Sequence, residues 1–345
     1  MKSFDLQTLQ RKAIRNLKPY SSARDEFQGN ASIFLDANEN SFCQSEQNYH
    51  RYPDPLQRKL KSMLAKQKGI AENQIFIGNG SDEAIDLLFR AFAEPNQDNL
   101  LIFPPTYGMY EVSAMIHSLE IRRELLTPAF ELPENPLQQV DEHTKLILIC
   151  SPNNPTGNRF SENNIRKILT EFSGIVVLDE AYIDFSESDS MLKYLAEFPN
   201  LVILQTFSKA WGLAGVRVGM AYANPEIISI LNKIKPPYNV SQPAQEIAIN
   251  ALRNADETLK WIQAIRQQRE FVYQELCQIP FCKVWKSEAN FLLVRLPDAN
   301  DWYQRFLKAG VVVRNRSSLP LCENTLRITI GTEQENNILL SVLQA

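Results

Sequence analysis

LVILQTFSKAWGLAGVRVGMAYA, residues 201–223, contains two apolar runs separated by a glycine-rich turn. The runs LVILQ (201–205) and VRVGMAYA (216–223) are typical of strands, because their branched side chains pack well in a buried sheet. Lys209 lies in the turn among small and aromatic residues, although a lysine is usually a solvated surface residue. The stretch therefore predicts two strands with an unusual amine at the end of the first.

Strand-like and helix-like runs alternate on the N-terminal side of this stretch. Strands are expected at residues 76–78, 99–103, 119–125, 145–150 and 174–179, and helices at residues 54–68 and 81–93. This alternation favours an α/β fold with a mostly parallel central sheet and helices on both faces. We assign residues 31–240 to this large domain.

The pattern changes after about residue 240. A long charged helix comes first, and strands are then expected at residues 291–296, 310–315 and 325–331. Helices followed by a few strands suggest a smaller α+β domain. Residues 1–30 are too short to fold alone, so we expect them to pack against that second domain. The predicted small domain consists of residues 1–30 and 241–345.

Composition excludes several classes of protein. The chain of 345 residues has a formal net charge of −4, whereas a nucleic-acid-binding protein is expected to be basic. The longest apolar runs, such as LILIC (146–150), are too short to span a membrane. The N-terminal sequence has no apolar signal region. We expect a cytoplasmic protein with no nucleic-acid or membrane partner.

Cysteine and histidine usage gives no sign of a disulfide or a metal centre. The five cysteines are scattered and form no CxxC pair, which favours reduced thiols. The three histidines show no metal-ligand spacing. We therefore expect no metal.

Polar residues follow several of the predicted strands. In a parallel sheet, functional groups gather beyond the carboxyl ends of the strands. GNGSDE (78–83) runs from a strand into a helix and forms either an anion site of backbone amides or an ordinary helix cap. SPNNPTG (151–157) and DEAY (179–182) follow two other strands. Asp179 requires a partner, because a lone buried carboxylate is costly.

Together these groups match the needs of pyridoxal phosphate, which requires a lysine, a carboxylate and a phosphate site. NPTG (154–157), DEAY (179–182) and SKAWGLAGVRVG (208–219) occur in that order. The chain resembles the fold-type I pyridoxal-phosphate aminotransferases over nearly its whole length. The resemblance implies that Lys209 forms the Schiff base with the cofactor and then carries a proton.

The resemblance also implies roles for the other site residues. Asp179 would pair with the pyridine nitrogen, and Tyr182 and Asn154 would bind the 3-oxygen of the ring. Lys209, Asp179 and Tyr182 would be the catalytic residues. The cofactor phosphate and ring would be bound by Ser208, Arg217, Ser81, the amides of Asp82 and Glu83, and the stacked Tyr107.

A finer resemblance is to the histidinol-phosphate aminotransferases. It rests on KPYSSARDE (18–26), LDANENSF (35–42), RYPDP (51–55), PPTYGMY (104–110), VRNRSS (313–318) and LRITIGT (326–332). These enzymes convert histidinol phosphate and 2-oxoglutarate reversibly into imidazole-acetol phosphate and glutamate. By this resemblance Arg327 receives the anion of both substrates, Arg314 and Tyr20 add phosphate contacts, and Asn38 lines the substrate end.

Tyr52 lies in the proline-bounded loop RYPDP. In the resembled family, the tyrosine at this place reaches the cofactor phosphate of the neighbouring subunit. The resemblance therefore implies a homodimer with shared active sites.

Three alternatives stay open. A threonine-phosphate decarboxylase shares the cofactor machinery and the phosphate pocket, and the two reactions differ in how the site orients the substrate. An aromatic-amino-acid aminotransferase of the same fold is a second alternative. A non-catalytic regulator built on this fold is the third, and the negative charge and the presence of Lys209 argue against it.

Overall fold

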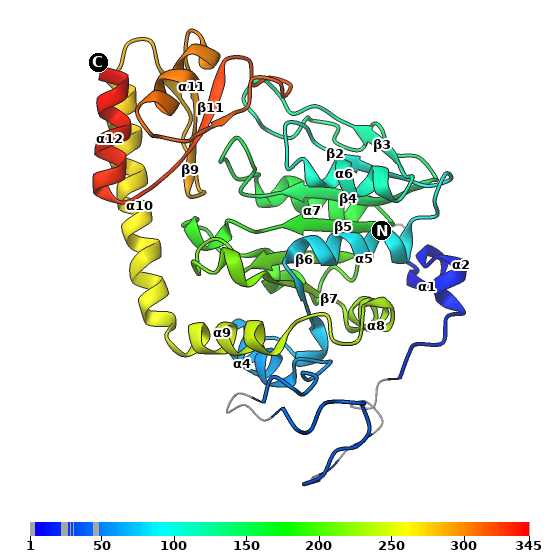
Figure 1. Cartoon of the computed structure of the whole chain (residues 1–345). Coiled ribbons are helices and arrows are strands. Elements are labelled where there is room, and N and C mark those ends of the chain that lie inside the picture. The colour runs from blue at the N-terminus through cyan, green and yellow to red at the C-terminus, as the bar shows by residue number, and fades with distance from the viewer. Residues whose placement is uncertain (1–3, 22–26, 28, 30, 44–47, 345) are drawn as a thin grey trace.

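The computed structural model describes residues 4–21, 27, 29, 31–43 and 48–344. Seven strands form a large central sheet in the order β1-β7-β6-β5-β4-β2-β3 (Figure 1). These strands are β1 Ile75–Asn79, β2 Asn99–Ile102, β3 Glu120–Arg123, β4 Thr144–Cys150, β5 Ile175–Asp179, β6 Leu201–Thr206 and β7 Val218–Ala223. Strand β7 is antiparallel to β1 and β6, and the other pairs are parallel. The predicted mostly parallel sheet is confirmed.

Helices cover both faces of the large sheet. One face packs against α4 (Arg58–Lys68), α7 (Glu162–Glu171) and α9 (Gln242–Arg253). The other packs against α5 (Ser81–Phe92), α6 (Met109–Ile116) and α8 (Pro225–Ile234). Strand β4 contributes Ile147 and Ile149 to one core, and Leu146 and Leu148 to the other. This alternation follows from the two-residue period of a strand.

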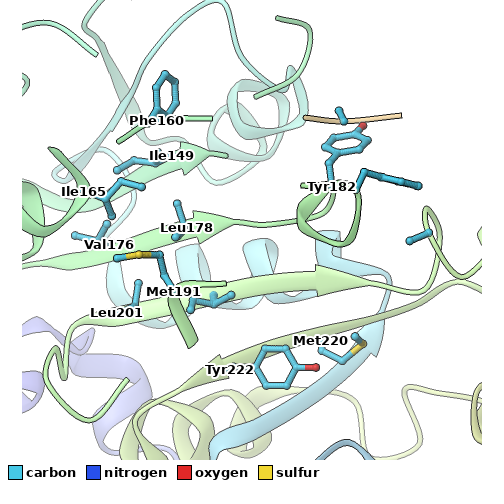
Figure 2. Close-up of a cluster of buried hydrophobic side chains, with 14 of the residues drawn as sticks. Ile149, Phe160, Ile165, Val176, Leu178, Tyr182, Met191, Leu201, Met220 and Tyr222 are labelled. Carbon is cyan, nitrogen blue, oxygen red and sulfur yellow. The ribbon is translucent and has the colours of Figure 1, made fainter. Parts of the chain in front are cut away.

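Figure 2 shows part of the first core, where side chains from neighbouring strands lie side by side. Val176 and Leu178 of β5 contact this core together with Leu201 of β6. Tyr182 follows the end of β5 and is also buried in it. The packed strands therefore hold their carboxyl ends in fixed positions.

A second, antiparallel sheet follows in the order β10-β11-β9-β8. Its strands are β8 Lys283–Val284, β9 Phe291–Arg295, β10 Arg314–Asn315 and β11 Thr325–Thr329. The helices α10 (Ala255–Cys277), α11 (Ala299–Lys308) and α12 (Glu333–Gln344) pack with this sheet around a separate core. In Figure 1 the long helix α10 runs from α9 up to this part of the molecule. The 3-10 helices η1 to η4 are Glu72–Gln74, Ile183–Phe185, Met191–Tyr194 and Ala214–Val216.

The N-terminal helices α1 (Leu6–Leu9) and α2 (Lys12–Arg15) differ from expectation in their packing. Leu6 joins the core around α5, and the Arg11 amide donates to Ala91 O at 2.9 Å. Lys233 of α8 donates to Ile14 O at 2.8 Å. Residues 6–15 therefore pack against the large-sheet layer, because Leu6 is buried in its core and Arg11 pairs with Glu94 just after α5. The division into two domains stays a prediction.

Two predicted elements are shorter in the structure. The helix expected over 54–68 begins at Arg58, because Gln57 has a left-handed backbone with φ 50°. Only Arg314–Asn315 of the run 310–315 pair as a strand. Within the described ranges, no helix combines the length and apolar character needed to cross a membrane. The same ranges contain no group of three histidine, cysteine or acidic side chains placed to hold a metal.

Candidate active site

A cavity lies at the carboxyl ends of β4, β5 and β6. It is lined by Gly80, Ser81, Asp82, Tyr107, Cys150, Asn154, Asp179, Ala181, Tyr182, Thr206, Ser208, Lys209 and Arg217. Strand β5 ends at Asp179, and β6 ends just before Ser208 and Lys209. Because these strands are parallel, residues that follow them emerge at the same edge of the sheet. The expected gathering of polar groups at this edge is present.

One end of the cavity is arranged for an anion. Arg217 Nη1 donates to Ser208 Oγ at 3.3 Å, and Nη2 lies 3.4 Å from Asp82 Oδ2. Helix α5 begins after Gly80 without a side-chain cap, so its first amides are not occupied by a capping side chain. Such amides, a hydroxyl and a guanidinium together are suited to bind a phosphate.

Glycines allow the close contact of β7 with the start of α5. A Cβ on Gly219 would lie 2.1 Å from the Ser81 backbone nitrogen. Gly80 has φ +73°, and a Cβ there would lie 2.5 Å from Arg217 Nη2. Only residues without a Cβ fit these two positions. The glycines therefore bring the anion-binding amides and Arg217 to one place.

Asp179 is fully enclosed at the end of β5. The Tyr110 hydroxyl donates to its Oδ2 at 2.7 Å, and the Ala181 amide donates to its Oδ1 at 3.0 Å. Burial raises the pKa of Asp179, while these two hydrogen bonds lower it. The carboxylate is thus fixed in orientation by two donors.

Lys209 has an amine without a conventional partner. Its Nζ lies 5.5 Å from the centre of the Tyr182 ring. It has no hydrogen bond or ion pair with any residue that the structure describes. Burial lowers the pKa of Lys209, the charge of Arg327 lowers it further, and Asp179 and Asp82 act in the opposite direction. A lowered pKa increases the share of neutral amine, which can act as a nucleophile or a base.

Arg327 connects the second sheet to the cavity. Its Nη1 donates to Asn154 Oδ1 at 2.7 Å, and its guanidinium carbon lies 5.3 Å from the Phe291 ring centre. Burial lowers the pKa of Arg327, and its Nε is buried without a hydrogen-bond partner. A third cationic group, besides Arg217 and Lys209, therefore borders the cavity from the second sheet.

Several predicted site residues lie away from this cavity. Tyr20 is 76% exposed, and Tyr52 stacks on Tyr238 with ring centres 4.4 Å apart. Asn38 and Tyr52 line a separate hollow on the surface. Within one chain, the structure therefore does not bring these three residues to Lys209.

Two further predicted residues lie near the cavity without lining it. Arg314 is exposed and lies opposite Arg327 in the β10–β11 pair. The Glu83 carboxylate accepts from the Asn79 amide at 2.5 Å and from Asn239 Nδ2 at 3.0 Å. Its side chain thus supports the turn before α5.

Residues 27–343 match the family described as aminotransferase class I and II. The chain belongs to the class I and II aminotransferases. A relative from Flavobacterium johnsoniae, named histidinol-phosphate aminotransferase, is 51% identical over 100% of this chain and 99% of its own length. The predicted aminotransferase family is confirmed.

Solved structures of known aminotransferases share this fold. The histidinol-phosphate aminotransferase from Clostridium acetobutylicum is 25% identical, with a TM-score of 0.80 over 86% of this chain and 91% of that one. The histidinol-phosphate aminotransferase from Sinorhizobium meliloti, solved in complex with pyridoxal-5'-phosphate, is 23% identical, with a TM-score of 0.79 over 89% and 90%. The predicted fold-type I architecture is confirmed.

Other residues of this aminotransferase site escaped the sequence analysis. Cys150 and Thr206 line the cavity as the last residues of β4 and β6, and both positions follow from the strand-end rule. Tyr110 lies in the quoted PPTYGMY segment, but its contact with Asp179 spans 69 residues of chain. A contact over that separation leaves no local signal in the sequence.

Proposed function

We propose that this aminotransferase transfers the amino group of L-histidinol phosphate to 2-oxoglutarate, giving imidazole-acetol phosphate and L-glutamate in histidine biosynthesis. The observation that carries the proposal is one cavity in which Lys209, Asp179 and Arg217 meet, with Arg327 at its border. The choice of substrate is supported by 51% sequence identity, over the full chain, to a relative named histidinol-phosphate aminotransferase.

The donor set of the cavity fits pyridoxal phosphate as the cofactor. Ser81, Ser208 and Arg217 supply hydroxyl and guanidinium donors for the phosphate. Asp179 supplies a negative charge for a protonated ring nitrogen, and Tyr107 supplies an aromatic face. When bound, the cofactor supplies the electron sink that lets the Cα proton of an amino donor leave.

The remaining polar residues would orient and move protons. The Lys209 amine, with its lowered pKa, would bind the cofactor covalently and then accept and return the proton at the substrate Cα. Tyr182 and Asn154 would hydrogen-bond the ring oxygen. Arg327 already donates to Asn154, so anion binding and ring binding would be coupled through that amide.

Two substrates with different anions must use one site. Glutamate presents a carboxylate and histidinol phosphate presents a phosphate monoester. A guanidinium binds both in a bidentate manner. We assign Arg327 to the shared anion and Arg314 to the phosphate, with Tyr20 and Asn38 contributing from the N-terminal part of the chain.

A homodimer in the cytoplasm completes the proposal. Tyr20, Ile33, Leu35, Phe42 and Tyr52 expose 76%, 75%, 85%, 99% and 51% of their surface in one chain. Apolar side chains gathered in one exposed segment favour coverage by a partner. A second copy would cover them and would bring Tyr52 to the neighbouring cofactor phosphate.

A half-reaction assay tests the proposal. Purified protein with bound cofactor is mixed with L-histidinol phosphate in the absence of an acceptor, and the cofactor absorbance is followed. We expect complete conversion to pyridoxamine phosphate and recovery when 2-oxoglutarate is added. Release of carbon dioxide from threonine phosphate, with no conversion by histidinol phosphate, would assign the protein to the decarboxylases instead. Preference for an aromatic amino acid would support the other alternative.

A further inference from the structure

Three arginines lie on one face of the small sheet. In the antiparallel β10–β11 pair, Arg314 is directly opposite Arg327. The Arg316 amide continues the pair by donating to Thr325 O at 2.9 Å. Alternate strand residues share a face, so Arg316 lies on the face of Arg314 and Arg327. Leu293, opposite Arg327 on β9, belongs to the core that includes the large sheet, so this face is turned toward that sheet. Arg327 on this face donates to Asn154 of the cavity lining.

The side chain of Arg316 has no hydrogen-bond or ion-pair partner in the described part of the chain. Its Nε is buried without a hydrogen bond, and it forms no ion pair with any described residue. Burial lowers the pKa of Arg316, and the charges of Arg327 and Arg314 lower it further, while the Tyr182 hydroxyl raises it. Ser317 Oγ and Arg327 Nε are also buried without partners. A partly buried cation beside two other cations, as Arg316 is beside Arg327 and Arg314, is unfavourable unless an anion joins them.

Arg295 provides a contrast on the same face of the sheet. It lies opposite Thr325, on the other side of β11 from Arg316. Its Nε donates to Glu323 O at 2.9 Å and its Nη2 donates to Leu321 O at 2.8 Å. An arginine that supports the fold here is thus fully engaged, whereas Arg316 is not.

We infer that Arg316 is a specificity-determining residue, a third guanidinium that binds the phosphate dianion of the amino donor beside Arg314 and Arg327. The inference rests on the proposed function, since it names a residue that distinguishes the two amino donors, histidinol phosphate and glutamate. A phosphate monoester carries up to two charges and three acceptor oxygens, whereas a side-chain carboxylate carries one charge and two oxygens. A cluster of three guanidinium groups, of which only Arg327 has a described hydrogen bond, to Asn154, therefore suits the phosphate better than the carboxylate.

The test compares wild type with Arg316→Gln and Arg316→Lys. We expect Arg316→Gln to lower kcat/KM for histidinol phosphate by about 10- to 100-fold, the range for a lost hydrogen bond to a charged group, and for glutamate by less than about threefold. The kcat/KM of Arg316→Lys for histidinol phosphate should lie between the values of wild type and Arg316→Gln, because lysine keeps the positive charge but lacks the planar guanidinium that binds two oxygens. Lys308→Gln is the control. It removes an exposed positive charge from α11 and should leave kcat/KM unchanged for both donors.

Two further readouts separate binding from structure. Wild-type kcat/KM for histidinol phosphate should rise as the pH passes the second phosphate ionisation at about 6, and Arg316→Gln should flatten this rise. Inorganic phosphate should inhibit the glutamate reaction of the wild type more strongly than that of Arg316→Gln. Equal losses for both donors, with unchanged phosphate inhibition, would overturn the inference.

The outcomes also separate this inference from the proposed function. If wild type fails to convert histidinol phosphate, the proposed function is wrong, while phosphate inhibition of the glutamate reaction still tests Arg316. If Arg316→Gln does not fold, Arg316→Lys carries the comparison of the two donors. A lysine variant with equal losses for both donors would contradict the inference.

Discussion

The Tyr110 hydroxyl donates a 2.7 Å hydrogen bond to Asp179 Oδ2 in a fully buried setting. Burial raises the pKa of Asp179 and this hydrogen bond lowers it, so the tyrosine helps to keep the carboxylate charged. We therefore propose that Tyr110 acts through Asp179 as a positioning residue.

We predict that Tyr110→Phe raises the pKa of Asp179 further. As the pH falls, Asp179 then takes up a proton at a higher pH, so the acidic limb of the kcat/KM profile should shift to higher pH. Activity near pH 7 should fall about tenfold or more, on the scale of one hydrogen bond to a charged group. Tyr222→Phe is the matched control, because Tyr222 is a buried tyrosine whose hydroxyl has no hydrogen-bond partner among the described residues. An unchanged acidic limb in Tyr110→Phe would show that Tyr110 only fills space.

Replacement of Gly219 by alanine tests the close contact between β7 and α5. The new Cβ would meet the Ser81 backbone nitrogen at 2.1 Å, so the strand and the helix start must separate. We expect a weaker affinity for pyridoxal phosphate and a loss of about 1–3 kcal/mol in the free energy of unfolding. Gly215→Ala is the control, because a Cβ there meets nothing within 4 Å. Equilibrium dialysis and urea unfolding of both variants make the comparison, and equal behaviour would refute the steric argument.

Lys209→Ala should abolish transamination while the fold is kept. Lys209 carries the primary amine of the cavity lining, which can form a Schiff base with an aldehyde and can also carry a proton at Cα. Borohydride treatment of the wild type should attach the cofactor to the peptide that contains Lys209. Lys193→Ala, which removes an exposed amine paired with Glu162, is the control and should keep full activity. Cofactor found on any other lysine after peptide mapping would remove Lys209 from this role.

The architecture could be predicted from the sequence, because short runs of apolar residues indicate buried strands. Runs such as 145–150 and 174–179 became β4 and β5 with small changes of boundary. The sequence did not predict that β7 is antiparallel, since the residue pattern of a strand is the same in both directions. The packing of residues 6–15 on α5 and α8 was not predicted either, because the sequence of a short amphipathic helix does not indicate which element it packs against.

The candidate site was predictable where its residues follow strands along the chain. Asp179 and Lys209 could be found in this way. The contact of Tyr110 with Asp179 and the lack of a partner for Arg316 depend on distant segments. The first feature arises from the packing of α6 on the large sheet and the second from the surroundings of the small sheet, so a linear pattern contains neither.

The exposed Tyr52 leads to a prediction of subunit complementation. If its hydroxyl serves the partner's site, Tyr52→Ala should lower activity in a homodimer. A mixture of Tyr52→Ala and Lys209→Ala chains, unfolded and refolded together, should regain about a quarter of wild-type activity, because each mixed dimer has one intact site. Lys209→Ala refolded with itself is the control. No recovery in a mixture shown to contain mixed dimers would place Tyr52 outside the partner's site.

Lys61 gives a prediction about stability and pH. This α4 lysine is 7% exposed, and burial, together with the charge of Lys235, lowers its pKa to about 8. Between about pH 8 and the ordinary lysine value near 10.5, the unfolded chain binds this proton and the folded chain does not, so the free energy of unfolding should rise with pH.

Lys61→Met should therefore stabilise the protein by about 1–3 kcal/mol at pH 7, where the buried amine is charged, and should remove the rise between about pH 8 and 10.5. Lys59→Met, on the exposed side of the same helix, is the control and should leave that rise in place. Urea unfolding at a series of pH values measures both effects. Comparison with Lys59→Met removes the pH-dependent changes in the free energy of unfolding that come from other groups. A Lys61→Met protein that is less stable than wild type at pH 7 would mean that the charged amine is compensated by its surroundings.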